Sequence, residues 1–95
     1  MKYRKKPVEI EAFQIETAHD YLHEKNPAWF SDAIEAKTVF VKIYGSEVIV
    51  HIHTLEGVMT SSTGDWIIRG VVGELYSCQD DVFKMTYELV EEEGP

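Results

Sequence analysis

The segment 39-VFVKIYGSEVIVHIH-53 is the most informative part of this chain, because apolar residues alternate with other residues on both sides of one turn. Before the turn, valine or isoleucine occupies the odd-numbered positions, and after it the even-numbered positions from 48 to 52. Gly45-Ser46, between the two halves, is typical of a two-residue hairpin loop. The sequence therefore predicts an antiparallel hairpin whose strands are rich in β-branched residues.

Short elements are expected on both sides of this hairpin. Before it, alternation predicts a strand over residues 8–15. Thr17 is a candidate cap for a helix that ends near Lys25, before Asn26-Pro27. A second helical turn is expected to begin at Ser31. After the hairpin, the patterns predict a strand over 58–60, a strand pair over 66–69 and 74–78, a helical turn beginning at Asp80-Asp81, and a last strand over 87–90.

These elements predict an α+β fold, in which a short N-terminal helical region packs on a curved antiparallel sheet or small open barrel. A chain of 95 residues suffices for one domain, which we place at residues 1–90. Residues 91–95 contain no apolar side chain except the terminal proline and are expected to form a disordered acidic tail. Trp66 lies between a Gly-Asp turn and an apolar strand, so we expect a buried anchor of the core.

The charge of the chain is negative and unevenly distributed. The chain has 17 acidic and 9 basic residues and a net charge of −8, and four basic residues lie in the first six positions. An acidic chain repels a phosphate backbone, so direct nucleic-acid binding is not expected. No apolar run approaches the ~18 residues of a membrane helix, and Glu9 and Glu11 interrupt any signal-peptide core. We therefore expect a cytoplasmic protein whose acidic surface provides solubility or binds a basic site on another protein.

Two histidine pairs have the spacing of metal ligands. His19 and His23 would share a helix face, and His51 and His53 a strand face. No HExxH, CxxC or carboxylate cluster accompanies them, so we expect neither a metal nor another cofactor and interpret both pairs as solvated polar faces. The single cysteine, Cys78, lies in an alternating strand and is interpreted as a small hydrophobe. No catalytic residue is predicted, and we expect a protein that is not an enzyme.

Several segments carry a resemblance to a known family. They are 3-YRKKPV-8, 10-IEAFQ-14, 54-TLEG-57, 64-GDWIIRGV-71, 73-GELY-76 and 83-FKMTY-87. Together they resemble a family of small, mostly uncharacterised proteins of bacteriophages and prophages, over about half of the chain. Relatives commonly have lysine at the position of Val72, and Pro-Cys-Lys-Pro where this chain has residues 77–80. The chain thus lacks two basic groups near Arg69, which weakens any anion-binding role of this hairpin.

The composition and the resemblance together predict a non-enzymatic phage or prophage accessory protein that binds a host or phage protein. Interference with host defence is one purpose that such binding would serve. Asp80 and Asp81 are candidate partner-binding residues on the folded body. A second hypothesis is a small-ligand binder that sequesters a nucleotide signal in a pocket of an oligomer, with Arg69 as the ligand-binding residue. A third is a metal-dependent enzyme that uses the histidine pairs.

A homo-oligomer, and specifically a dimer, is also expected. Short strands leave open sheet edges, and a core of this size is marginal in a single copy. The central hairpin has a second apolar face that carries Phe40, Tyr44 and Ile49. We expect one face of the hairpin to pack on the core and the other on a second copy.

Overall fold

The central hairpin is present in the computed structural model, which describes residues 1–90. Strands β2 (Val39–Tyr44) and β3 (Glu47–Thr54) pair antiparallel along the whole length of β2. Gly45 adopts a φ of 60° in the two-residue loop, a conformation that glycine reaches without a steric penalty. The prediction for this stretch is confirmed.

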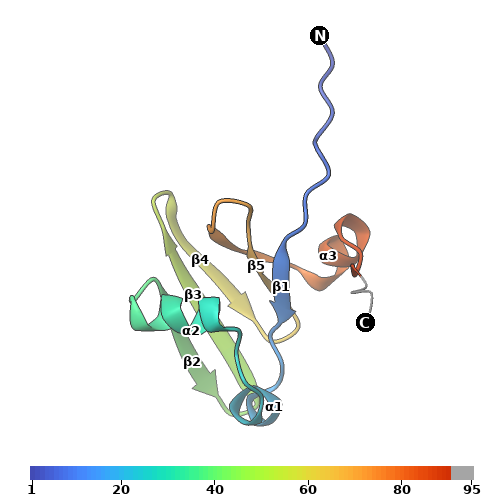
Figure 1. The fold of residues 1–95 in the computed structure, drawn as a ribbon. Helices are drawn as coiled ribbons and strands as arrows, with labels where there is room; N and C mark the ends of the chain where they lie inside the picture. Colours follow the sequence, from blue (N-terminus) through green and yellow to red (C-terminus); the bar gives the residue numbers. More distant parts are fainter. Residues whose placement is uncertain (91–95) are drawn as a thin grey trace, which may run out of the picture.

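The fold is α+β, with two open three-stranded antiparallel sheets, β2-β3-β4 and β1-β5-β6 (Figure 1). The other elements are β1 (Glu11–Gln14), α1 (Ala18–His23), α2 (Ala28–Glu35), β4 (Gly57–Ser62), β5 (Trp66–Arg69), β6 (Leu75–Cys78) and α3 (Asp80–Thr86). Helix α1 contacts β3 and helix α2 contacts β2. The expected fold class, with an N-terminal helical region packed on sheet, is therefore confirmed, and neither sheet closes into a barrel.

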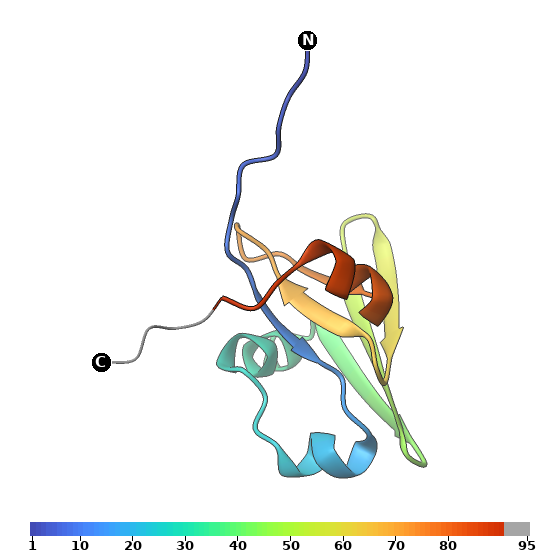
Figure 2. The same ribbon diagram turned by 90° about the vertical axis from the view of Figure 1, so that its right-hand side faces the viewer.

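One buried cluster joins the two sheets. Its members are Ile15, Ala18, Phe30, Val39, Val48, Val50, Ile52 and Ile67, so α1, α2, β2, β3 and β5 all contribute. The ring of Phe30 is fully buried, and the ring of Phe13 meets it edge-on at 4.8 Å. Helices α2 and α3 lie on opposite sides of the molecule (Figures 1 and 2). Helix α2 thus covers the core, whereas α3 buries no residue.

The N-terminal elements differ from the prediction at their ends. The first strand begins at Glu11 instead of residue 8, because its partner β5 ends at Arg69, directly opposite Glu11. Helix α1 ends at His23, where the next residue is extended. Helix α2 begins at Ala28, three residues before Ser31, with Pro27 as its N-cap. Proline fits the start of a helix because the first N–H groups there have no partner within the helix.

The C-terminal elements correct two further predictions. Residues 87–90 form no strand; α3 continues to Thr86, and residues 87–90 have no regular structure. Trp66 is half-buried, not buried, and its ring stacks on that of Phe83 at 3.9 Å outside the buried cluster. The predicted tail at residues 91–95 lies outside the described residues. Within residues 1–90, no helix is long and apolar enough to span a bilayer.

Candidate functional site

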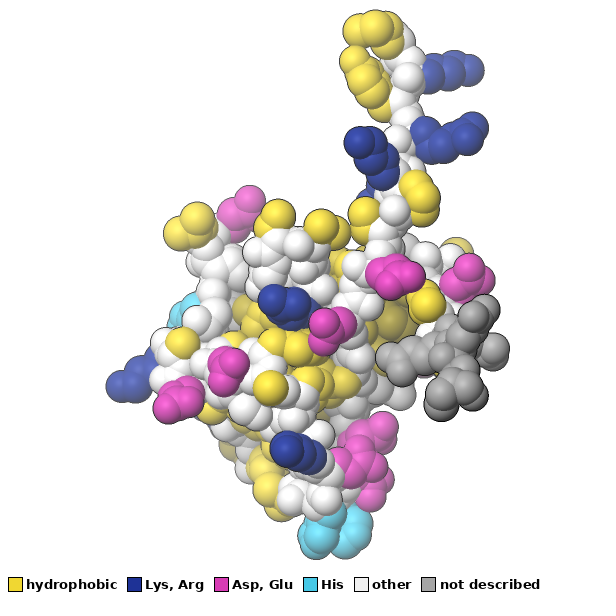
Figure 3. Space-filling model, viewed as in Figure 1, with side chains coloured by type: hydrophobic (Ala, Val, Ile, Leu, Met, Phe, Trp, Pro, Cys, Tyr) yellow, Lys and Arg dark blue, Asp and Glu magenta, His cyan; other side chains and the backbone are white. Residues whose placement is uncertain are grey.

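A groove of about 1030 Å³ lies between α2, the turn that joins β3 to β4, and the turn that joins β5 to β6. Its buried and half-buried lining is mainly apolar and comprises Trp29, Ala33, Ile52, Met59 and Leu75, together with Thr38 and Tyr76. Leu55, at the tip of the β3–β4 turn, also lines the groove and is fully exposed. Figure 3 shows a hollowed face with hydrophobic side chains gathered near its centre. A concave, largely apolar site of this size is typical of a ligand or peptide site.

The groove carries more negative than positive charge. Three exposed carboxylates line it, those of Asp32, Glu56 and Glu74, together with one guanidinium, that of Arg69. The Arg69 Nη1 atom lies 3.8 Å from a carboxylate oxygen of Glu11 on the neighbouring strand. The structure thus places Arg69, the residue predicted to bind an anionic ligand, in a groove whose other charges are carboxylates. This arrangement favours a cationic ligand over a phosphate.

The β5–β6 turn holds one of these carboxylates in position. The Glu74 side chain crosses directly over Gly70, so closely that a Cβ atom on residue 70 would collide with it. The Glu74 carboxylate also accepts the backbone N–H of Val72 at 3.0 Å, and Gly73 has a φ of 87°. The two glycines of the 70-GVVG-73 turn therefore allow a tight reversal that directs the Glu74 carboxylate back over the turn.

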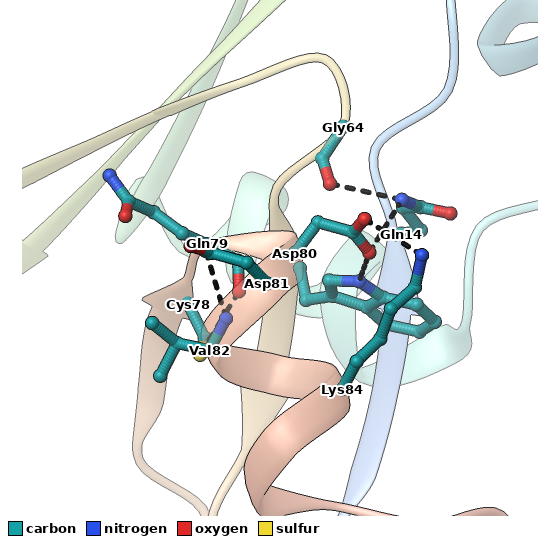
Figure 4. Close-up of polar contacts among 9 residues, drawn as sticks. Gln14, Gly64, Cys78, Gln79, Asp80, Asp81, Val82 and Lys84 are labelled. Carbon is teal, nitrogen blue, oxygen red and sulfur yellow. Dashed lines mark hydrogen bonds and ion pairs between the residues drawn. The ribbon is translucent and has the colours of Figure 1, made fainter.

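Asp80, a predicted partner-binding residue, is engaged within the chain (Figure 4). Its Oδ1 atom accepts the indole N–H of Trp66 at 2.8 Å and the side-chain amide of Gln14 at 3.3 Å. Its Oδ2 atom lies 3.0 Å from the ammonium of Lys84. Hydrogen bonds from Trp66 and then from Lys84 lower the pKa of Asp80, because they stabilise the ionised carboxylate. Asp80 therefore connects α3 to β1 and β5.

Asp81, the second predicted partner-binding residue, is exposed at the start of α3. Its only hydrogen bond among the described residues is local, from the backbone N–H of Val82 at 2.9 Å. Its charge thus faces solvent, and a role for Asp81 in partner binding stays a prediction.

The two histidine pairs lie on different elements, α1 and β3. The His19 and His23 rings are 4.4 Å apart, and His23 Nδ1 lies 2.7 Å from the carbonyl oxygen of His19. On β3, His51 contacts the hydroxyl of Thr60 at 3.1 Å and the His53 ring packs on Phe40. Within residues 1–90, no group of three or more histidine, cysteine or acidic residues is placed to hold a metal ion.

Cys78 is half-buried on β6, and its thiol points to the carbonyl oxygen of Gln79 at 3.5 Å. Burial, followed by the nearby charges of Asp81 and Asp65, raises the pKa of this thiol. A raised pKa keeps the thiol protonated at neutral pH, and the protonated form is a poor nucleophile.

Sequence reasoning identified Arg69 but not the groove around it. The apolar lining comes from α2, β3, β4 and β6, and no pattern in the sequence brings these segments together. One local signal was present: Leu55 occupies the tip of a turn, where polar residues and glycine are usual. A fully exposed leucine at a turn is a useful indicator of a contact surface only beside other apolar residues.

Comparison of the chain with protein-family models, with curated proteins and with solved structures finds no match.

Proposed function

We propose that this protein is a non-enzymatic binding protein whose groove holds an extended, basic and apolar segment of a partner protein. The supporting observation is the groove itself, with its apolar lining and the exposed carboxylates of Asp32 and Glu56. Apolar contacts would supply most of the affinity, and the carboxylates would attract lysine or arginine and orient the segment. An extended peptide is the natural occupant of a groove that runs between two hairpin turns and a helix.

The biological setting of this proposal comes from the resemblance to bacteriophage and prophage proteins. In that setting the protein works in the cytoplasm of a bacterial host, and its partner is a host or phage protein. The open sheet edges, and not the resemblance, suggest that it works as a homodimer. Interference with host defence is one purpose that such binding would serve. The net charge of −8 suits a basic partner, because complementary charge accelerates association.

The nucleotide-binding hypothesis is the second candidate, and it rests on Arg69. A nucleotide needs several converging cations or backbone N–H groups around its phosphates. Arg69 is the one Lys or Arg side chain among the groove-lining residues, and it already lies beside Glu11. Three carboxylates in the same groove would repel phosphate, so the peptide hypothesis is preferred.

Selection of displayed random peptides on the purified protein tests the proposal. We expect the retained peptides to combine lysine or arginine with aromatic or aliphatic residues, and to bind more weakly as salt screens the carboxylates. The double variant Asp32→Lys/Glu56→Lys should lower their affinity at least tenfold; neither carboxylate makes a hydrogen bond or ion pair within residues 1–90, so the fold should persist.

The matched control is Glu24→Lys/Glu47→Lys, which makes the same change of charge at two exposed residues outside the groove. This control should retain the affinity of the parent within about twofold. Selection of acidic peptides, or equal loss of affinity in both double variants, would contradict the proposed site. Binding of a nucleotide that is lost on Arg69→Ala would favour the second candidate.

A further inference from the structure

The first eight residues form a basic arm whose side chains make no hydrogen bond, ion pair or aromatic contact with residues 9–90. This N-terminal arm, 1-MKYRKKPV-8, is exposed at every residue, and it extends away from the body in two perpendicular views (Figures 1 and 2). Side chains alternate in an extended chain, so Met1 and Tyr3 share one side, while Lys2 and Arg4 share the other. Tyr3 keeps 87% of its surface exposed. The aromatic ring of Tyr3, which lies beside four cations, is therefore not covered by its own copy.

The arm has the chemistry that the groove is proposed to accept. Its four basic side chains, Lys2, Arg4, Lys5 and Lys6, match the exposed carboxylates of the groove, and the side chains of Met1 and Tyr3 match the apolar lining. The rest of the chain, residues 7–95, has 5 basic and 17 acidic residues, a balance of −12 against the +4 of residues 1–6. One molecule therefore carries both a cationic peptide and an anionic groove.

We propose that the arm of one copy binds in the groove of a second copy, in a reciprocal exchange that forms a symmetric dimer. The inference rests on the proposed function, since it assigns the proposed peptide site a first occupant. Exchange of identical segments is a common route to a dimer, because each contact formed occurs twice.

The direction of the arm favours a second copy over the arm's own groove. The arm leaves β1 at Glu11, which lies directly opposite Arg69 at the edge of the groove. To enter its own groove, the chain would have to reverse within residues 6–10. The structure has no turn or bend within residues 1–10, and the arm points away from the body (Figures 1 and 2). An extended arm of eight residues reaches roughly 26 Å, far enough to cross into a neighbouring molecule.

Light scattering on the full chain tests the exchange through its mass. We expect about 22 kDa, twice the chain mass of 10.9 kDa, at 100 µM protein and low salt. The arm variant Arg4→Glu/Lys5→Glu and the groove variant Asp32→Lys/Glu56→Lys should each dissociate at least tenfold more readily. All four residues are exposed and outside the core, so both variants should keep the far-ultraviolet spectrum of the parent.

Combining the arm and groove variants in one chain provides the decisive control. This fourfold variant places two glutamates on the arm and two lysines in the groove, so attraction between these positions should restore part of the dimer. A monomeric full chain would overturn the exchange, whether the arm is free or folded onto its own copy. A dimer that survives the arm variant would also overturn it and would point to another interface, such as the outer face of β2. Binding of a single-stranded oligonucleotide by the arm of a monomeric full chain would overturn it as well.

The arm variant also separates this inference from the proposed function, because its groove is free for other segments. If this variant retains the selected basic peptides but the parent and the variant have the same mass, only the arm exchange is wrong. If it retains no peptide, the groove is not a peptide site, and the proposed function fails together with the exchange.

Discussion

Replacing Trp66 by alanine tests how α3 is attached to the body of the protein. Helix α3 has no buried residue, so it depends on a few contacts at its inner side. Two of them come from Trp66: its ring lies parallel to that of Phe83, with 3.9 Å between centroids and 6° between planes, and its N–H donates to Asp80 at 2.8 Å. We expect Trp66→Ala to release α3 while the buried cluster stays folded.

The expected loss of stability follows from the burial of Trp66. Truncation of a fully buried tryptophan to alanine costs about 3–5 kcal/mol. Trp66 is half-buried, so about 2 kcal/mol is expected from packing, and the aromatic pair adds about 1 kcal/mol. The sum, about 3 kcal/mol, is a large part of the roughly 5–15 kcal/mol that stabilises a domain. It corresponds to a decrease in Tm of roughly 12–24 °C for a domain of this size.

Urea unfolding followed by circular dichroism measures this loss, and amide hydrogen exchange shows where it acts. In Trp66→Ala, amides of residues 80–86 should exchange faster, whereas those of β2 and β3 should remain protected apart from the global loss of stability. Trp66→Phe is the matched control, because it retains an aromatic ring for Phe83 but cannot donate to Asp80. A loss below about 1 kcal/mol, with unchanged exchange in α3, would refute the view that Trp66 attaches this helix.

Three further predictions follow from the core and from two shifted pKa values. Phe30→Ala should cost about 3–5 kcal/mol in urea unfolding, because the ring is fully buried in the cluster; a loss below 1 kcal/mol would contradict this. Asp80 should titrate below its ordinary pKa of about 3.9 in carbon-detected NMR. Its contribution to stability is therefore present above that pH and is lost as the pH falls through the lowered pKa. In Trp66→Phe the pKa of Asp80 should rise toward the ordinary value. Partial burial and the hydroxyl of Tyr87, 3.1 Å away, raise the pKa of Tyr76 to about 12. The contribution of Tyr76 to the stability of the fold is therefore present below pH 10 and is lost as the pH rises toward 12. Tyr87→Phe should lower the pKa of Tyr76 in an ultraviolet titration.

The elements whose pattern is local could be predicted from the amino-acid sequence. The alternation over 39–53 and the Gly45-Ser46 loop specify the β2–β3 hairpin, because a two-residue loop sets the register and the alternation sets which face is buried. The boundaries of β5 were likewise predictable from residues 66–69. The balance of −12 beyond residue 6 and the isolated basic N-terminus are also properties of the sequence alone.

The pairing of the strands and the surroundings of Arg69 depend on long-range contacts and could not be predicted. β5 pairs with β1, more than fifty residues earlier, and this pairing divides the strands into two sheets instead of one. It also leaves the Trp66 side chain on the α3 side, where it is half-buried. The groove collects side chains from α2, β3, β4 and β6, and its charge is the sum of residues far apart in the chain. The periodicity of apolar residues shows how neighbours along the chain are arranged. A groove depends instead on packing between distant segments, which no local pattern encodes.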